Sequence, residues 1–288
     1  MPVDDRLTVV SCEIPPDKVD ALFELLDPDL FTPTSWIDLE KNSSRIDVFL
    51  EDASRAGTVS RALVETAELI GLTLETTLST IDRKDWAESW KRFFHVEKIS
   101  EHLVVRPSWE PYTPQAGERV IQLDPGMSFG TGKHATTQAC LRFLDRLATE
   151  DRDRSVVDMG CGSGILSIGA KILGFNDVRA FDNDPDCIPV TRENAAFNQV
   201  EFPVTVDDLS HPHPETDIVV ANILAPILIH FAPQVAASVA RHPGARLILS
   251  GILDEQYGEV RKAYEAQGMR EIGTILIENW RSGLFSRK

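Results

Sequence analysis

Apolar positions along the chain follow two different periods, two residues in some runs and close to 3.6 residues in others. The first kind predicts β-strands, and the second predicts helices that bury one face. Over the first 80 residues the predicted elements are, in order, a strand at Leu7–Ile14, a helix at Pro16–Leu26, strands at Trp36–Leu39 and Ile46–Leu50, a helix at Ala53–Ile70 and a strand at Leu72–Thr80. Further along, the predicted strands are His102–Trp109, Val120–Leu123, the start of Val156–Gly164, Val178–Phe181, Val204–Val206, Ile218–Ala221, Ala245–Leu249 and the antiparallel pair Glu271–Trp280 and Leu284–Phe285.

The order of the first six elements, β-α-β-β-α-β, is typical of a ferredoxin-like α+β unit. From Val156 onward, strands and helices alternate, which predicts an α/β domain with a doubly wound sheet whose ligand binds at the carboxyl ends of its strands. The charged and aromatic stretch Ile81–Ile99 predicts a largely helical connector. Because 288 residues exceed the usual size of one domain, we predict a small domain at 1–80, a connector at 81–99 and a doubly wound domain at 100–288.

The stretch VVDMGCGSG at Val156–Gly164 carries the most specific pattern. An apolar run ends in an acid and leads into three glycines at alternate positions, which predicts a strand, a tight turn and a helix, with a ligand against the backbone of Gly160 and Gly162. The spacing G-x-G-x-G differs from the dinucleotide pattern G-x-G-x-x-G, because Ile165 stands at the third glycine position. Asp182 follows the next strand, about 20 residues later, where an acid commonly binds the two ribose hydroxyls.

This combination resembles motif I and the following acidic residue of class I S-adenosylmethionine-dependent methyltransferases. A lone glycine turn also occurs in parallel α/β domains for packing alone, but the acids before and after it favour a ligand that contains a nucleoside. Because the spacing argues against a pyrophosphate, S-adenosylmethionine is favoured over NAD. The pair Asp207-Asp208, after the following strand, could accept a hydrogen bond from an adenine amino group, although turn capping explains it equally well.

A second stretch, LDPGMSFGTGKHATT at Leu123–Thr137, is rich in glycine and hydroxyl side chains. It predicts a loop that closes over a ligand and presents Thr136 or Thr137 at the N-terminus of a helix, Gln138–Leu147. The alternative is an entry loop whose threonine only caps that helix. The stretch does not fit the phosphate-binding pattern G-x-x-x-x-G-K-[ST]. His134 could act as a base, but the sequence supplies no orienting partner, so it is not counted as catalytic.

The third stretch begins with Asn222 at the carboxyl end of a predicted strand, level with Gly160 and Asp182. Methyl transfer to nitrogen needs a neutral amine held in line with the methyl group, and the carboxamide oxygen of Asn222 is a suitable acceptor to orient it. Many nitrogen methyltransferases have [DN]-P-P-[YF] here, and those that act on nucleic acids stack the base on the final aromatic residue. Ala225 occupies that position, which favours an aliphatic amine. The alternative is that Asn222 caps the next segment and Pro226 breaks the backbone.

Composition narrows the class of protein. The formal net charge of −16 disfavours a nucleic-acid substrate and suits a basic protein substrate, although solubility alone also explains it. There is no C-x-x-C pair, which argues against a zinc site and a disulfide framework and favours a reducing compartment. We predict no metal, no signal peptide, no membrane span of about 20 apolar residues, and a cytoplasmic location. The four cysteines are Cys12, Cys140, Cys161 and Cys187.

Three stretches together, LDPGMSFGTGKHATT, VVDMGCGSGILSIGAKILG and DIVVANILAPIL, followed by LILSGIL, resemble the ribosomal protein methyltransferase family (PrmA family) that modifies protein eleven of the bacterial large ribosomal subunit. The resemblance covers Trp86 to the C-terminus by motif and the earlier residues by architecture only. It implies a seven-stranded class I methyltransferase domain after a substrate-recognition domain, and methylation of α-amine and lysine ε-amines by a monomer. It also implies that Thr137, Gly160, Asp182 and Asn222 contact the cofactor. Gly162 is added to this set from the glycine turn, and Asn222 is the predicted catalytic residue.

Two other functions stay open at this point. One is a lysine methyltransferase for another protein, such as the β subunit of electron transfer flavoprotein. The other is a non-catalytic ribosome-binding module that has kept the fold, against which the intact Gly160, Gly162, Asp182 and Asn222 argue. Methylation of several amines on one substrate would require the catalytic domain to be re-aimed, and the connector at 81–99 could act as the hinge.

Overall fold

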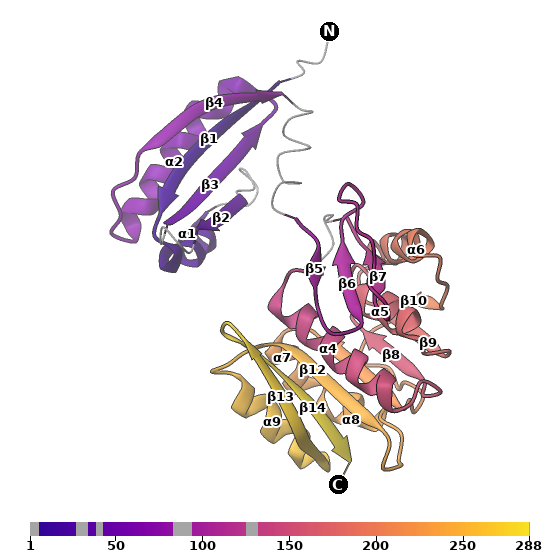
Figure 1. Cartoon of the computed structure of the whole chain (residues 1–288). Helices are drawn as coiled ribbons and strands as arrows, with labels where there is room; N and C mark the ends of the chain where they lie inside the picture. Colours follow the sequence, from indigo (N-terminus) through magenta and orange to yellow (C-terminus); the bar gives the residue numbers. More distant parts are fainter. Residues whose placement is uncertain (1–5, 27–33, 39–42, 83–93, 125–131, 288) are drawn as a thin grey trace. The chain divides into compact units, whose positions relative to one another are not determined.

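A computed structural model describes residues 6–26, 34–38, 43–82, 94–124 and 132–287 of the chain. The chain forms two compact units, Met1–Arg92 and Phe93–Lys288, which are described separately here (Figure 1). Each unit has its own apolar core.

The first unit is a four-stranded antiparallel sheet with helices on one face (Figure 1). Its strands lie in the order β2-β3-β1-β4, as the predicted ferredoxin-like arrangement requires. Apolar side chains of β1 and β3, such as Val10 and Ile46, pack against Val59 and Leu63 of α2. The elements are β1 (Arg6–Ile14), η1 (Pro16–Lys18), α1 (Val19–Leu25), β2 (Thr34–Asp38), β3 (Ser43–Leu50), η2 (Ala53–Arg55), α2 (Ala56–Leu69) and β4 (Thr76–Asp82).

The second unit is built on a seven-stranded sheet with the order β10-β9-β8-β11-β12-β14-β13. Its first five strands run parallel, and β14 pairs antiparallel with both β12 and β13. The predicted doubly wound, seven-stranded class I methyltransferase fold is thus confirmed. The elements are α4 (Ala135–Glu150), β8 (Val156–Met159), α5 (Ile165–Leu173), β9 (Val178–Asp182), α6 (Cys187–Phe197), β10 (Val204–Val206), β11 (Ile218–Asn222), α7 (Ala225–His230), α8 (Ala232–Ala237), β12 (Arg246–Leu253), α9 (Tyr257–Ala266), β13 (Met269–Ile277) and β14 (Trp280–Arg287).

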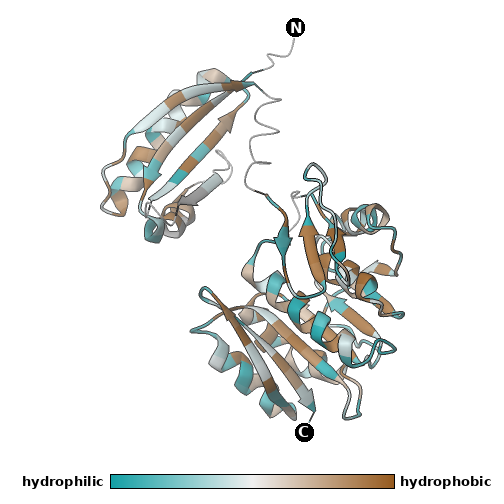
Figure 2. Ribbon diagram, in the orientation of Figure 1, coloured by the Kyte–Doolittle hydropathy of each residue, from teal (hydrophilic) through white to brown (hydrophobic). Residues whose placement is uncertain are grey.

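Side chains of the parallel strands alternate between two cores, one on each face of the sheet. In β11, Ile218 and Val220 belong to the core formed with α4 and α5, whereas Val219 and Ala221 belong to the core formed with α7, α8 and α9. Figure 2 shows the resulting hydrophobic strands between helices that are hydrophilic on their outer faces. Because both faces are buried, these strands appear in the sequence as continuous apolar runs.

A small three-stranded sheet precedes α4 and is formed by β5 (Glu97–Lys98), β6 (Leu103–Arg106) and β7 (Arg119–Gln122). The two ends of the predicted helical connector at Ile81–Ile99 are strands instead, because β4 extends to Asp82 and β5 begins at Glu97. The helical prediction for residues 83–93 lies outside the described residues. So does the part of the glycine-rich loop at residues 125–131.

The starts of two helices differ from the sequence predictions, and two further helices were not predicted. The helix α4 begins at Ala135, so both threonines belong to its first turn, and its N-cap is His134. The sequence Asp184-Pro185 predicts the N-cap and first turn of a helix that runs to roughly Asn198. The helix α6 begins at Cys187 with Asp186 as its N-cap, so the predicted N-cap at Asp184 is wrong. The sequence patterns do not predict α7 and α8. Pro226 lies in the first turn of α7 instead of breaking the backbone, because the first N–H groups of a helix need no intrahelical acceptor.

Candidate functional site

Four of the five residues predicted to bind the cofactor lie at the carboxyl ends of β8, β9 and β11, and Thr137 lies in the first turn of α4. They line one pocket of about 460 Å³, which also includes Cys161, Ile165, Asp184 and Ile223 among its walls. The site residues that the structure brings together are Thr137, Gly160, Gly162, Asp182 and Asn222.

The glycine turn after β8 has a backbone that requires glycine. Gly160 has a φ of +78°, and a Cβ atom added to it would lie 2.7 Å from Cγ2 of Ile223. The backbone of Gly160 is therefore in close contact with the residue that follows Asn222. The N–H of Gly160 donates to the carbonyl oxygen of Phe181 at 2.9 Å, which fixes the turn on β9.

Asp182 ends β9 and is oriented by two backbone donors. Its Oδ2 accepts from the N–H of Gly162 at 2.8 Å, and its Oδ1 accepts from the N–H of Asp184 at 3.0 Å. Each carboxylate oxygen has further lone pairs, so the side chain can also accept hydrogen bonds from two hydroxyls of a ligand. This is the arrangement that the acid predicted to bind a ribose needs.

Thr137 and Asn222 supply two oxygen atoms that lack a partner. Thr137 Oγ1 and Asn222 Oδ1 are buried and make no hydrogen bond to the described part of the chain. A buried polar atom without a partner is costly. Because both atoms belong to residues that line the same pocket, the arrangement fits a polar ligand that would satisfy them.

Side chains from the middle of α6 hydrogen-bond to the glycine turn. Thr191 Oγ1 donates to the carbonyl oxygen of Gly162 at 2.8 Å, and Asn194 Nδ2 donates to that of Ser163 at 2.8 Å. These bonds satisfy the carbonyl oxygens of Gly162 and Ser163 and fix the turn against α6.

A second hollow of about 380 Å³ adjoins the first and shares Gly160, Asn183 and Ile223 with it. Its other lining includes Asp207 and Asp208 together with Leu209, Ser210, Ile227 and Phe231. An apolar wall with an acidic edge suits a flat heterocycle that carries an amino group.

Asp207 and Asp208 are also bound within their own turn. Asp207 Oδ1 lies 2.5 Å from His211 Nδ1, and Asp208 Oδ1 accepts from the N–H of Ser210 at 2.6 Å. The hydrogen bond from His211 holds the pKa of Asp207 below its usual range. Both carboxylates are ionised at neutral pH and cap the turn, so turn capping is part of their role.

Asp158 lies behind the glycine turn and is 1% exposed. Its Oδ2 accepts from the hydroxyl of Ser167 at 2.7 Å, whereas its Oδ1 makes no hydrogen bond within the described residues. Burial raises the pKa of Asp158 to about 6, and the hydrogen bonds from Ser167 oppose that rise. Asp158, the acid before the first glycine, is thus a buried carboxyl group with a raised pKa beside the site.

His134 is the N-cap of α4. Its Nδ1 accepts from the hydroxyl of Thr136 at 2.7 Å and from the N–H of Thr136 at 3.4 Å. The ring meets Trp280 edge to face, with centroids 4.9 Å apart. Burial lowers the pKa of His134, against the attraction of Glu278. The sequence predicts a threonine as the cap, but a histidine fills that role, and it has the orienting partners that the sequence alone does not reveal.

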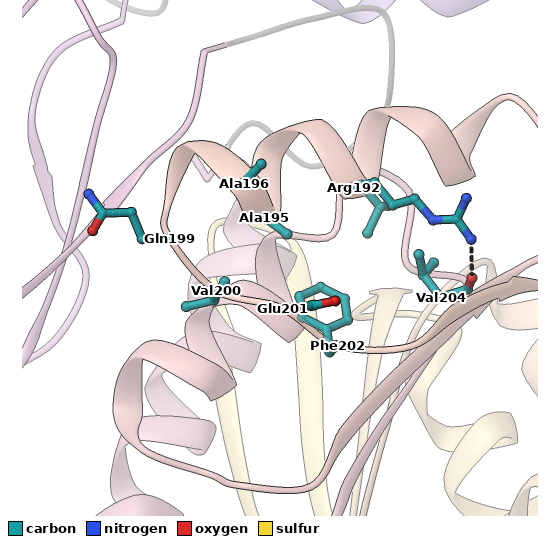
Figure 3. A pocket seen from close by; sticks show the side chains of 9 residues that line it. Arg192, Ala195, Ala196, Gln199, Val200, Glu201, Phe202 and Val204 are labelled. Carbon is teal, nitrogen blue, oxygen red and sulfur yellow. Dashed lines mark hydrogen bonds between the residues drawn. The ribbon is translucent and has the colours of Figure 1, made fainter.

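Figure 3 shows another pocket, of about 510 Å³, beside α6 and the segment that follows it. Its lining is mostly apolar, including Ala195, Val200 and Phe202. The guanidinium of Arg192 donates to the carbonyl oxygen of Val204 at 3.1 Å. Because this charged group already has a backbone partner, the pocket with Thr137 and Asn222 is the better candidate for chemistry.

The described residues contain neither a cluster suited to a metal ion nor a membrane-spanning helix. Within them, no group of three or more His, Cys, Asp or Glu side chains is placed to hold a metal ion. No helix in the described ranges has the length and apolarity needed to cross a membrane.

Sequence reasoning did not find the second hollow's apolar wall or the contact between Gly160 and Ile223. The acid pair after β10 was a signal for the hollow, but Ile227 and Phe231 come from α7 and its end, which the sequence patterns miss. The contact depends on how closely β8 and β11 approach, which no local pattern encodes.

Comparisons with known proteins agree with this geometry. The profile of the family described as ribosomal protein L11 methyltransferase (PrmA) matches residues 24–288. A relative of that name from Geobacter sulfurreducens is 37% identical over 301 residues, which covers 99% of this chain and 97% of the relative. Another from Exiguobacterium sibiricum is 42% identical over 216 residues, covering 73% of this chain and 67% of the relative.

Among solved structures, the ribosomal protein L11 methylase from Lactobacillus delbrueckii subsp. bulgaricus superposes with a TM-score of 0.60 and 33% sequence identity. The match covers 68% of this chain and 100% of that chain.

Proposed function

This chain belongs to the ribosomal protein L11 methyltransferase family, and we propose that it uses S-adenosylmethionine to methylate amino groups of ribosomal protein L11. Family membership makes the chain a methyltransferase and disfavours the other two functions considered from the sequence. One observation carries the assignment of the site. The buried Thr137 Oγ1 and Asn222 Oδ1, neither of which has a hydrogen-bond partner among the described residues, belong to the same pocket as Asp182 and the glycine turn.

The residues of this pocket fit S-adenosylmethionine, which supplies an electrophilic methyl group on a sulfonium. Asp182 would accept the ribose hydroxyls, and the adjoining hollow near Asp207 would take the adenine. The N–H groups of Gly160 and Gly162 already donate to Phe181 and Asp182, so the glycine turn would let the amino-acid portion approach the backbone closely, and Thr137 Oγ1 would bind it.

Asn222 is the proposed catalytic residue. Displacement at a methyl group needs the attacking nitrogen in line and neutral, so the enzyme contributes mainly approach geometry. Asn222 Oδ1 can accept an N–H bond from the amine and direct its lone pair at the methyl group. No covalent nucleophile is required for this step.

The substrate class follows from charge as well as from family. Lysine side chains and an α-amine are cationic in solution, and the chain carries a net charge of −16. The mouth of the pocket is acidic, with Asp184 and Asp186 exposed beside Asp182. Such a rim attracts basic protein segments and steers them to the site.

We assign substrate recognition to the predicted domain at 1–80 and a hinge role to the connector at 81–99. Different relative placements of the two units would allow one catalytic pocket to reach several amines. We further propose that the protein acts as a monomer in the cytoplasm, where unmodified ribosomal protein is made.

The test is intact mass spectrometry of unmethylated ribosomal protein L11 after incubation with the enzyme and S-adenosylmethionine. We expect a series of mass steps of one methyl group each. Asn222→Ala should slow these steps by about a hundredfold, the typical cost of lost alignment. The matched control is Asn176→Ala, an exposed asparagine, which should behave as the wild type.

The outcomes separate the candidate functions. No mass change with cofactor binding intact would contradict the proposed substrate and direct attention to other lysine-rich proteins. A wild-type protein that fails to bind S-adenosylhomocysteine in calorimetry would contradict the methyltransferase site itself and favour a non-catalytic module.

A further inference from the structure

Ser250 of β12 touches both walls of the proposed cofactor pocket. In the parallel pair of β11 and β12, Ser250 lies opposite Asn222. The carbonyl oxygen of Ser250 accepts from the N–H of Ile223 at 3.2 Å. Its hydroxyl donates to the carbonyl oxygen of Thr136 at 3.2 Å. One residue therefore connects the strand end that carries Asn222 with the first turn of α4 that carries Thr137.

The Ser250 hydroxyl is completely buried and has more than one polar neighbour, including the Cys140 thiol. Its Oγ lies 2.6 Å from the Oγ of Ser282 on β14, which is also completely buried. A hydroxyl has one hydrogen, so when Ser250 donates to Thr136, Ser282 must donate to Ser250. In this arrangement the Ser250 hydroxyl links Ser282 of β14 to the Thr136 carbonyl of α4.

The backbone of Gly251, next to Ser250, lies so close to the backbone of Ile223 that a residue with a side chain would clash there. Gly251 has a φ of +82°, and a Cβ atom there would lie 2.4 Å from the carbonyl oxygen of Ile223. The register of β12 against β14 shifts between Leu249 and Ile252. At this irregularity, residues 250–251 lie close to the end of β11, which carries Asn222.

We propose that Ser250 is a positioning residue for methyl transfer. Its hydroxyl lies between Ser282 and the Thr136 carbonyl and sets the spacing between Thr137 and Asn222. The buried side-chain oxygens of these two residues are the proposed cofactor contacts. The inference rests on the proposed function of those two residues as cofactor contacts. Ser250 acts through its contacts with their immediate neighbours in the sequence.

A double-mutant cycle tests this role. The variants are Ser250→Ala, Thr137→Val and the double variant of the full-length protein, and the measurement is affinity for S-adenosylhomocysteine by calorimetry. We expect Ser250→Ala to weaken binding about tenfold, the effect of one hydrogen bond. In the Thr137→Val background the same change should cost less than about threefold, because coupled residues are non-additive.

Ser238→Ala is the matched control. Ser238 is completely buried, and its hydroxyl donates to the carbonyl oxygen of Val235 at 2.7 Å in α8. The control should lower the thermal midpoint about as much as Ser250→Ala while leaving cofactor affinity within twofold of the wild type. Ser250→Thr keeps the hydroxyl, and Ser282→Ala removes its donor from the other side. Recovery of affinity in the first, or a loss in the second, supports the role.

Three results would overturn the inference. They are Ser250→Ala affinity within twofold of the wild type, additive effects in the cycle, and an equal loss in Ser238→Ala. The proposed function fails separately, when the wild type itself binds no S-adenosylhomocysteine. If the wild type binds S-adenosylhomocysteine and Ser250→Ala binds it with the same affinity, only the role of Ser250 is contradicted.

Discussion

A single methyl group added at Gly160 should distort the pocket, because it would clash with Ile223. Alanine there must adopt a φ of +78° and place its Cβ 2.7 Å from Ile223, and a left-handed backbone costs an L-residue about 1–2 kcal/mol. We expect Gly160→Ala to weaken S-adenosylhomocysteine binding by at least about tenfold in calorimetry, because Ile223 or the turn must move.

The matched control is Gly258→Ala in α9, where an added Cβ meets nothing within 4 Å. It should leave binding unchanged and stabilise the helix slightly. Equal affinities for Gly160→Ala and Gly258→Ala would show that the ligand does not depend on this turn.

At the scale of elements, a polar cluster joins the starts of two central strands. Ser155, just before β8, gives its N–H and its hydroxyl to Asp217 Oδ2 at 2.8 and 2.7 Å, and Asp217 lies just before β11. His242 Nε2 lies 2.6 Å from Asp217 Oδ1. The cluster lies at the amino ends of the strands, opposite the cofactor pocket, so its loss should affect stability and spare the chemistry.

This cluster predicts a pH dependence of stability. Burial would raise the pKa of Asp217, but hydrogen bonds from Ser155 and His242 outweigh it and hold the pKa below the usual value. A depressed carboxyl pKa stabilises the fold above the unfolded value of about 3.9, and this contribution is lost as pH falls through the folded value.

Urea unfolding of Asp217→Asn checks this prediction. We expect the variant to be less stable than the wild type by about 2 kcal/mol at pH 7, and the difference should shrink as the pH is lowered below about 4. Glu215→Gln is the control, since Glu215 forms an exposed ion pair with Arg241 worth little. A gap that stays constant down to pH 3 would rule out the ionised carboxylate as its source.

The same elements show what a sequence reveals and what it does not. The strands of the large sheet are short apolar runs buried on both faces, and Asp182 and the glycine turn are local patterns, so both were predictable. The helices α7 and α8 were not predicted, because each is only six residues long and has a proline in its first turn. The hydrogen bond between Ser250 and Thr136 joins residues 114 apart, a contact that only the folded sheet creates.

At the scale of the whole molecule, two units with separate cores share one chain. The core of the first unit includes Leu22 and Leu63, whereas the sheet of the second is buried on both faces. Cofactor binding in our proposal belongs wholly to the second unit, and recognition of the protein substrate belongs to the first. The two activities should therefore respond differently to a change that acts on charge at long range.

Salt concentration is such a change, because the chain has a net charge of −16 and its proposed substrate is basic. Raising potassium chloride from about 50 mM to about 300 mM shortens the Debye length from about 14 to about 6 Å. We expect the KM for ribosomal protein L11 to rise about tenfold through weaker steering. Affinity for S-adenosylhomocysteine should stay within about twofold, because its proposed contacts are hydrogen bonds at close range, which salt screens little. A short lysine peptide is the control substrate, and its KM should change less, since it meets only the acidic rim. If the KM for the whole protein does not respond to salt, shape and apolar contact govern recognition, and the acidic surface serves solubility alone.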